Sequence, residues 1–263
     1  MTGEVKQSSE ELSRLARQCV LRMTSEASAS HVGSALSVID ILSVLHHSYT
    51  FNDIENKLVF SKGHAASAYY SILYLTGRIS EEDFFSFGKN GTFLGGHISH
   101  QAAQEINLST GSLGHGFPYG VGLALAEKLN GSNKKVIIII SDGECDEGTT
   151  WESALLANKL KLDNLIVIID RNKIQSLGDT EVIMPLEPLS SKWESFNWNT
   201  LIIDGHSHLE IRKALSSELG PLCVVANTIK GKGVSFMENS VLWHYRPPSA
   251  DDLKLALSEL GEV

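Results

Sequence analysis

The sequence SDGECDEGTTWESALLANKLKLDNLIVIIDRN, residues 141–172, places a polar residue just after each of two apolar runs. The runs cover 136–140 and 165–169 and consist mostly of β-branched residues, which predicts strands buried on both faces of a parallel sheet. Between them, 149–160 has helical composition, with apolar residues spaced to cover one face. The pattern predicts a βαβ unit with two parallel strands.

The two polar residues are Asp142 and Asn172. Parallel strands bring both to the same carboxyl edge, where open α/β folds bind ligands. Mg²⁺ prefers oxygen ligands and commonly takes one or two carboxylates while phosphates supply much of the rest. Gly143 and Gly148 let the backbone approach a diphosphate closely. The segment therefore predicts a cofactor enzyme that binds Mg²⁺ and a diphosphate, although Asp142 and Gly143 alone would also suit an ordinary helix cap.

The rest of the chain alternates between predicted helices and strands. Ser8 and Glu11 form a possible capping box for a first helix. Further helices are predicted over 36–47, 65–75, 117–129 and 209–219, further strands over 58–60, 201–203 and 223–227, and a loop with short pieces over 182–198. The alternation predicts an α/β fold in three layers, with a mostly parallel sheet covered by helices on both faces.

Composition limits the classes of protein that this chain can represent. The 263 residues are 42% hydrophobic and lack a linker or an internal repeat, which predicts one domain over 1–263. A net charge of −9 argues against a nucleic-acid partner. No apolar stretch approaches ~20 residues and the N-terminus is polar, so neither a membrane span nor a signal peptide is expected. Three cysteines without metal spacing favour a reducing cytoplasm.

The 141–172 segment is similar to the thiamine diphosphate signature, which opens with Gly-Asp-Gly and closes one βαβ unit later with Asn. Its ending, LDNLIVIIDRNKIQ (162–175), resembles the transketolase branch of that family rather than the 2-oxo-acid dehydrogenase branch. Other segments with this likeness follow in the family order: SHVGSALSVIDIL (30–42), FSKGHAASAYYSILYLTG (60–77), GGH (95–97), TGSLGHG (110–116), IIDGH (202–206), TIKGKGVSFMEN (228–239) and WH (243–244).

The resemblance implies the thiamine diphosphate-binding fold of the diphosphate (PP) domain. Full-length transketolases continue with a pyrimidine-binding domain and a C-terminal domain, which are absent from this sequence. The chain therefore resembles the N-terminal subunit of a split transketolase. The family's catalytic glutamate belongs to the pyrimidine domain, so we expect a separate pyrimidine-domain subunit to complete the site, as an α₂β₂ heterotetramer, and the isolated chain to be inactive.

The resemblance also assigns the site residues. Metal ligands would be Asp142, Asn172 and the backbone carbonyl of Ile174. Thiamine diphosphate would also contact His64, Gly111, Leu113, Gly143 and His244. His31 and His244 match residues near the C3 hydroxyl of the sugar donor, and His97 matches the residue that bonds its C1 hydroxyl. Imidazole suits these tasks because it donates or accepts hydrogen bonds near neutral pH.

Other polar residues receive weaker assignments. His206 is expected to organise the site indirectly, and Lys230 and Lys232 to lie outside it, in a mainly structural loop or on the solvated surface. Glu147 and Glu152 match acids between paired active sites, although acids in a first helical turn also suit the helix dipole. Four histidines are interpreted as structural: His46, His47, His100 and His208. The sequence departs from the family at Ser141, where Gly is usual, and at His115, where Gln is common.

The implied reaction is nucleophilic catalysis by the thiazolium, which moves a two-carbon ketol (glycolaldehyde) unit from a ketose to an aldehyde or ketone. One alternative is decarboxylating acetyl transfer from a 2-oxo acid such as pyruvate to a sugar or nucleotide-linked sugar. Others are the α-subunit of a 2-oxo-acid dehydrogenase and a non-catalytic subunit. Retention of His31, His97 and His244 favours a hydroxylated donor. The sequence leaves open the donor, the acceptor, the pathway, the partner and the effects of Ser141 and His115.

Overall fold

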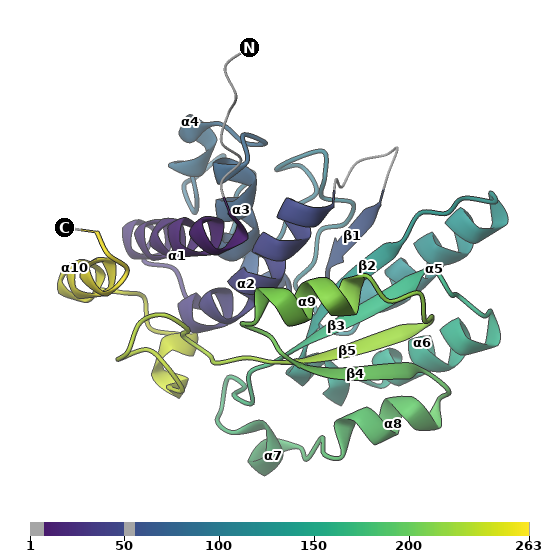
Figure 1. Cartoon of the computed structure of the whole chain (residues 1–263). Helices are drawn as coiled ribbons and strands as arrows, with labels where there is room; N and C mark the ends of the chain where they lie inside the picture. The colour runs from purple at the N-terminus through teal and green to yellow at the C-terminus, as the bar shows by residue number, and fades with distance from the viewer. Residues whose placement is uncertain (1–7, 50–55, 263) are drawn as a thin grey trace.

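A computed structural model describes residues 8–49 and 56–262 of the protein. Its five strands form one sheet in the order β1-β2-β3-β5-β4 (Figure 1). Every neighbouring pair is parallel, so the predicted α/β fold is confirmed. The strands are β1 (Lys57–Phe60), β2 (Val136–Ser141), β3 (Leu165–Arg171), β4 (Asn199–Asp204) and β5 (Leu222–Asn227).

Helices cover both faces of the sheet (Figure 1). One core contains residues of α1 (Ser9–Glu26), α2 (Val32–Ser48), α3 (Ala66–Leu75) and α9 (His208–Leu215), and the other contains residues of α5 (Gly116–Leu129), α6 (Gly148–Lys159) and α8 (Leu189–Ser195). Because successive strand residues point to opposite faces, Ile137 joins the first core and Ile138 the second. This explains why the strands are continuous apolar runs rather than alternating ones.

The predicted βαβ unit is β2, α6 and β3. Ser141 pairs with Asp170 in the parallel register, so the two strands end at the same edge of the sheet. Asp142 then opens a short 3₁₀ turn, η2 (Asp142–Asp146), and Asn172 follows β3 directly. α5 also begins near this edge, where Gly116 packs against Ser61 just beyond β1. The carboxyl edge therefore gathers several of the segments that the sequence marked as functional.

Some predicted boundaries were wrong. α2 begins at Val32, before the predicted 36, and α9 ends at Leu215, before the predicted 219. The Ser217 hydroxyl accepts a bond from the Leu219 amide, a local turn that competes with the helix. Within 182–198, the expected short piece is α8. Remaining elements are α4 (Glu81–Phe84), α7 (Thr180–Ile183), α10 (Ala250–Glu259), η1 (Gly63–Ala65) and η3 (Val241–His244).

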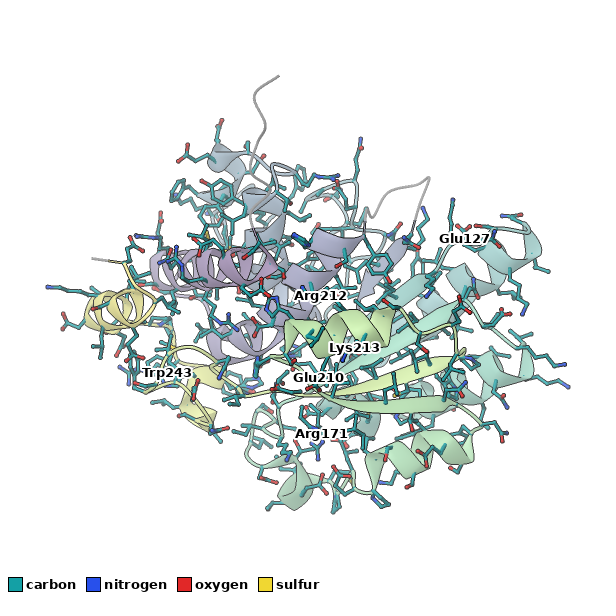
Figure 2. The ribbon with its side chains drawn as sticks, in the orientation of Figure 1. Glu127, Arg171, Glu210, Arg212, Lys213 and Trp243 are labelled. Carbon is teal, nitrogen blue, oxygen red and sulfur yellow. The ribbon has the colours of Figure 1, made fainter. Side chains whose placement is uncertain are left out.

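Helix ends and helix faces follow local chemistry. The Ser8 side chain accepts a bond from the Glu11 amide and caps α1, whereas the Glu11 carboxylate pairs with Arg14. α9 is amphipathic, with Glu210 and Lys213 on its exposed side (Figure 2) and Ile211 buried. Among the described residues, no helix is long and apolar enough to cross a membrane.

At this edge of the sheet the backbone at Gly63 lies very close to the backbone at Thr110. A Cβ added there would lie 2.4 Å from the carbonyl oxygen of Thr110. We expect Gly63→Ala to lower the free energy of unfolding by about 1–3 kcal/mol, as overpacking does, measured by urea unfolding. Gly122→Ala on α5 is the control, since its Cβ would meet nothing within 4 Å and should gain up to ~1 kcal/mol of helix stability. Equal stability of the two variants would contradict the prediction.

Candidate functional site

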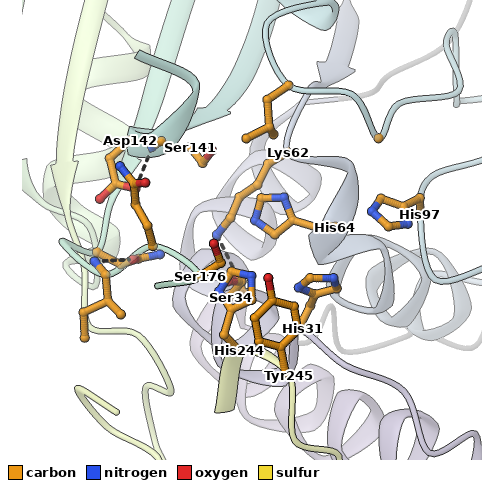
Figure 3. A pocket seen from close by; sticks show the side chains of 16 residues that line it. His31, Ser34, Lys62, His64, His97, Ser141, Asp142, Ser176, His244 and Tyr245 are labelled. Carbon is orange, nitrogen blue, oxygen red and sulfur yellow. Dashed lines mark hydrogen bonds between the residues drawn. The ribbon is translucent and has the colours of Figure 1, made fainter. Parts of the chain in front are cut away.

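A cavity of about 250 Å³ lies at the carboxyl edge of the sheet (Figure 3). All ten predicted site residues line it: His31, His64, His97, Gly111, Leu113, Asp142, Gly143, Asn172, Ile174 and His244. The lining also includes Ser141 and five residues that sequence reasoning did not assign: Ser34, Lys62, Gln175, Ser176 and Tyr245. The fold thus gathers the whole predicted set in one place, from segments spread along nearly the entire chain.

Asp142 and Asn172 are far apart in the sequence but lie side by side in the structure. The Asp142 carboxylate is buried and accepts bonds from the amides of Gly143 at 2.9 Å and Lys173 at 2.8 Å. The Asn172 side-chain oxygen accepts from the Ile174 amide at 3.1 Å. Lys173 adopts a left-handed conformation with φ of 64°, which turns the chain sharply between these residues. The result is a compact set of carboxylate, amide and carbonyl oxygens.

Electrostatics at Asp142 are set by burial. Burial raises the pKa of Asp142, and the nearby negative charge of Asp170 adds to the effect, while the Arg171 guanidinium opposes it. Arg171 lies 3.2 Å from the Asp142 carboxylate and also pairs with Glu181 of α7 at 2.5 Å. A buried carboxylate beside a second carboxylate is a group that a cation would stabilise.

Two buried lysines lie beside this oxygen set. The Lys62 ammonium donates to the Ser34 carbonyl at 2.7 Å and forms an ion pair with Asp170. The Lys230 ammonium lies 3.0 Å from the Ile174 carbonyl oxygen and 2.7 Å from Nδ1 of His244. Both side chains are fully buried. Burial, with the charge of Lys62, lowers the pKa of Lys230 to about 8.

Lys230 does not line the cavity, but it is buried directly behind two residues that do, rather than solvated. Its ammonium contacts two lining residues, and its alkyl chain packs against Gly33 at the start of α2. A lone lysine carries no sequence signal for such a position, because burial depends on acceptors that only the tertiary fold supplies. Lys232 does remain partly exposed, near Glu238.

Four histidines form a cluster at the other end of the cavity (Figure 3). The His31 ring lies 5.4 Å from His64, 5.8 Å from His97 and 4.9 Å from His244, measured between ring centroids. Burial is the main cause that lowers the pKa of His31 to about 4 and of His244 to about 3, and it also lowers the pKa of His64. These three imidazoles are therefore neutral at physiological pH and offer both donors and acceptors.

His31 has an unusual backbone conformation. It caps α2 in the left-handed region with φ of 69°, and its amide donates to the His244 carbonyl at 2.7 Å. A non-glycine residue there carries strain on the order of 1–3 kcal/mol, which is common at functional sites. Its ring nitrogen Nδ1 is buried and has no hydrogen-bond partner among residues 8–49 and 56–262. Both features are what a ligand-contacting position would show.

The glycine loop 110–116 is fixed by a carboxylate that sequence reasoning missed. Glu144 is buried and accepts bonds from the amides of Ser141 at 3.0 Å and Gly114 at 3.2 Å, and from the Ser61 hydroxyl. It thereby links the ends of β1 and β2 to the loop that carries Gly111 and Leu113. Ser141 lines the cavity, whereas His115 is exposed and contacts the Leu113 carbonyl at 3.0 Å.

The remaining predicted histidines and acids lie outside the cavity lining. Nε2 of His206 accepts from the Ile229 amide at 2.8 Å, so Nδ1 carries the proton and donates to Asp40 at 2.7 Å. Because Ile229 directly precedes Lys230, this contact helps to hold Lys230 against the lining residues Ile174 and His244. His208 is buried against Asp40 and is structural, as predicted. The two acids expected between paired sites, Glu147 and Glu152, are exposed.

Known proteins are similar to this chain in sequence and in fold. Residues 8–262 match the family described as the thiamine diphosphate binding domain of transketolase. An apulose-4-phosphate transketolase subunit from Actinobacillus succinogenes is 37% identical over 256 residues, covering 94% of this chain and 93% of that protein. The 6-deoxy-6-sulfo-D-fructose transketolase subunit SqwG from Clostridium sp. MSTE9 is also 37% identical, over 255 residues, with 93% of each chain covered.

Longer transketolases match in part. Human transketolase is 31% identical over 237 residues, which cover 86% of this chain but 38% of that protein. The crystal structure of transketolase from Campylobacter jejuni superposes with a TM-score of 0.89 at 32% identity, covering 97% of this chain and 43% of that one. The chain thus spans less than half the length of these two proteins. It belongs to the transketolase family, as a thiamine diphosphate-binding domain.

The buried ion pair beneath the site should dominate local stability. Lys62→Met would leave Asp170 charged and fully buried without its cation, which typically costs about 3–5 kcal/mol. We expect the double variant Lys62→Met/Asp170→Asn to recover part of that loss in urea unfolding. Lys128→Met, which breaks the exposed pair with Asp163, should change stability by less than about 1 kcal/mol. A similar small loss for Lys62→Met would show that the pair is not stabilising.

Proposed function

We propose that this chain is the thiamine diphosphate-binding subunit of a two-subunit transketolase, which transfers a two-carbon ketol unit from a ketose to an aldehyde or ketone. The observation that carries the proposal is one cavity that joins the oxygen set of Asp142, Asn172 and Ile174 to the cluster of four histidines. Names of relatives support it, because two proteins of nearly the same length are called transketolase subunits.

The residues present fit the cofactor and its metal. Carboxylate, amide and carbonyl oxygens are the donors that Mg²⁺ prefers, with the diphosphate supplying further oxygens. Among the described residues no group of three or more His, Cys, Asp or Glu could hold a metal, which agrees with a site of mixed ligands. Buried Lys62 and Lys230 add positive charge that favours an anionic ligand. When bound, thiamine diphosphate supplies a nucleophilic carbon and an electron sink.

Separate groups of residues would hold separate parts of the ligand. Gly143, His64 and His244 would contact the diphosphate, and Gly111 and Leu113 the aminopyrimidine. His31, His97 and His244 would bind donor hydroxyls. Because the Lys230 ammonium donates to Nδ1 of His244, the proton of that neutral imidazole resides on Nε2, which is left free to donate to a ligand.

The histidine cluster favours a hydroxylated donor over a 2-oxo acid. Hydroxyls need partners that both donate and accept, and neutral imidazoles provide both. A 2-oxo acid would place a carboxylate among these imidazoles, and His31 and His244 are neutral and offer it no opposite charge. A ketose is therefore the donor that these residues suit best.

A second subunit would complete the site. Of the described residues that line the cavity, Asp142 is the sole carboxylate, and it is assigned to the metal, so the acid that the cofactor's pyrimidine requires would come from outside this lining. The volume of about 250 Å³ also falls below the roughly 300–1,000 Å³ of complete ligand pockets. We infer that a pyrimidine-domain subunit covers the cavity, as a heterotetramer in a cytoplasmic pathway of carbohydrate metabolism.

The rim of the cavity offers a surface for that subunit. Leu177 follows the lining residues Gln175 and Ser176 and is 82% exposed, and Val182 on α7 is 83% exposed. α7 is tied to the site because Glu181 pairs with Arg171. We infer that these exposed apolar side chains belong to the surface that the second subunit covers.

The proposal is tested by calorimetric titration of thiamine diphosphate and Mg²⁺ into this chain, alone and with a pyrimidine-domain subunit. We expect tight binding and exchange of the C2 proton only in the complex. Asp142→Asn should abolish Mg²⁺-dependent binding because it removes the metal carboxylate, while Asp251→Asn, on α10, should bind as the unaltered chain does. If the complete pair binds no cofactor, the catalytic proposal is wrong.

Val182 tests the docking surface. We expect Val182→Asp to weaken binding of the pyrimidine-domain partner by at least about tenfold, equivalent to 1.4 kcal/mol, because it buries a charge in an apolar interface. The matched control is Leu129→Asp, since Leu129 is 78% exposed at the carboxyl end of α5, away from the cavity. Analytical ultracentrifugation measures the affinity of each variant for the partner. Equal affinities of the two variants would place the interface elsewhere.

A further inference from the structure

The histidine end of the cavity carries an aromatic side chain for which the proposed cofactor chemistry has no use. Tyr245 lines the cavity, and of the described lining residues it alone has a Phe, Tyr or Trp ring. Its ring centroid lies 4.8 Å from that of His244 and 6.1 Å from that of His31 (Figure 3). Tyr245 is nevertheless 60% exposed, and its hydroxyl has no hydrogen-bond partner within the described ranges.

The backbone around Tyr245 is fixed by its neighbours. Trp243 is buried, and its ring nitrogen donates to the Phe236 carbonyl at 3.0 Å. Arg246 lies 5.0 Å over the Trp243 ring and pairs with Asp252 of α10. Tyr245 therefore lies in a segment that its neighbours hold in place, while its own side chain is not packed in the core. An exposed ring held in this way at a cavity wall is available to a ligand.

The position of Tyr245 relates it to a particular part of the ligand. The His31 ring lies between two neighbours, 5.8 Å from His97 and 6.1 Å from Tyr245. In the proposed function His97 contacts the C1 hydroxyl of the donor, and His31 and His244 the C3 hydroxyl. Tyr245 adjoins the C3 contacts, so the donor carbons beyond C3 would lie against it.

The chemistry of the phenol suits a polyol chain. A sugar chain presents C–H groups that pack on an aromatic face and hydroxyls that bond to a phenolic O–H, which both donates and accepts. We propose that Tyr245 is a specificity-determining residue that contacts the hydroxylated carbon chain of the ketose donor beyond the two carbons transferred. This inference rests on the proposed function, and it adds a requirement for a long, hydroxylated donor.

In the complete two-subunit enzyme, two kinds of donor distinguish contact with the sugar chain from a general role of Tyr245 in catalysis. A panel of ketose phosphates of different chain length supplies the long donors. β-Hydroxypyruvate supplies the same two-carbon unit but carries a carboxylate, lost as CO₂, in place of the sugar chain. Tyr245→Ala removes the ring, Tyr245→Phe removes only the hydroxyl, and Leu242→Ala is the matched control, because Leu242 is 52% exposed on η3 and does not line the cavity.

We expect Tyr245→Ala to lower kcat/KM for the ketose phosphates about tenfold, chiefly through KM, a loss of the size seen for an aromatic contact residue. Tyr245→Phe should lose about threefold, as for one hydrogen bond. Turnover of β-hydroxypyruvate should stay within about twofold for both variants, and Leu242→Ala should match the unaltered enzyme with every donor. Cofactor titration and thermal unfolding check that both variants are folded and loaded.

Equal losses with both kinds of donor, or no loss with either, would overturn the role of Tyr245 while leaving the proposed function intact. If Tyr245→Ala does not fold, the comparison of the two donors with Tyr245→Phe decides the matter, because a phenylalanine keeps the ring. Failure of the unaltered two-subunit enzyme to transfer a ketol unit from any donor would instead overturn the proposed function, and the assignment of Tyr245 with it.

Discussion

The buried ion pair between Lys62 and Asp170 holds the functional edge of the sheet together. Lys62 follows β1, Asp170 lies in β3, and the Lys62 ammonium also bonds the Ser34 carbonyl of α2. Asp170 further accepts from Thr228, just beyond β5. Burial is the largest single influence and opposes ionisation of Asp170, but the Lys62 charge and the hydrogen bonds from Lys62, Ser37 and Thr228 together outweigh it and lower the pKa. One charge pair thus fixes strand ends from both sides of β2 and the helix that follows His31.

The cavity combines two electrostatic environments within a short distance. Burial and neighbouring positive charge keep His31 and His244 neutral, whereas Lys62 and Lys230 supply the cations near Asp142. Their separation follows from the fold, because the lysines find acceptors behind the oxygen set while the imidazoles face one another. A ligand with an anionic end and a neutral, hydroxylated end matches this arrangement.

Sequence reasoning recovered the framework because its signals are local or repetitive. The runs at 136–140 and 165–169 predicted β2 and β3, and their parallel direction placed Asp142 and Asn172 together. The histidine set came from motif resemblance, since no periodicity brings residues so far apart into one cavity. The roles of Glu144 and Lys230 behind the cavity, and of Tyr245 in its wall, were not predicted for a common reason: each depends on tertiary partners, or on a free face, that the chain does not signal locally.

The hydrogen bond from the His31 amide to the His244 carbonyl joins two residues that are far apart in the sequence. This separation affects when the site forms during folding. Contacts of such wide sequence separation form late, because the intervening chain must first close a long loop. During synthesis, the first helices emerge well before η3 exists, so a nascent chain lacks His244 and its histidine cluster is incomplete. A chain truncated before Val241 would consequently keep all five strands yet lack His244 and Tyr245, and with them one wall of the cavity.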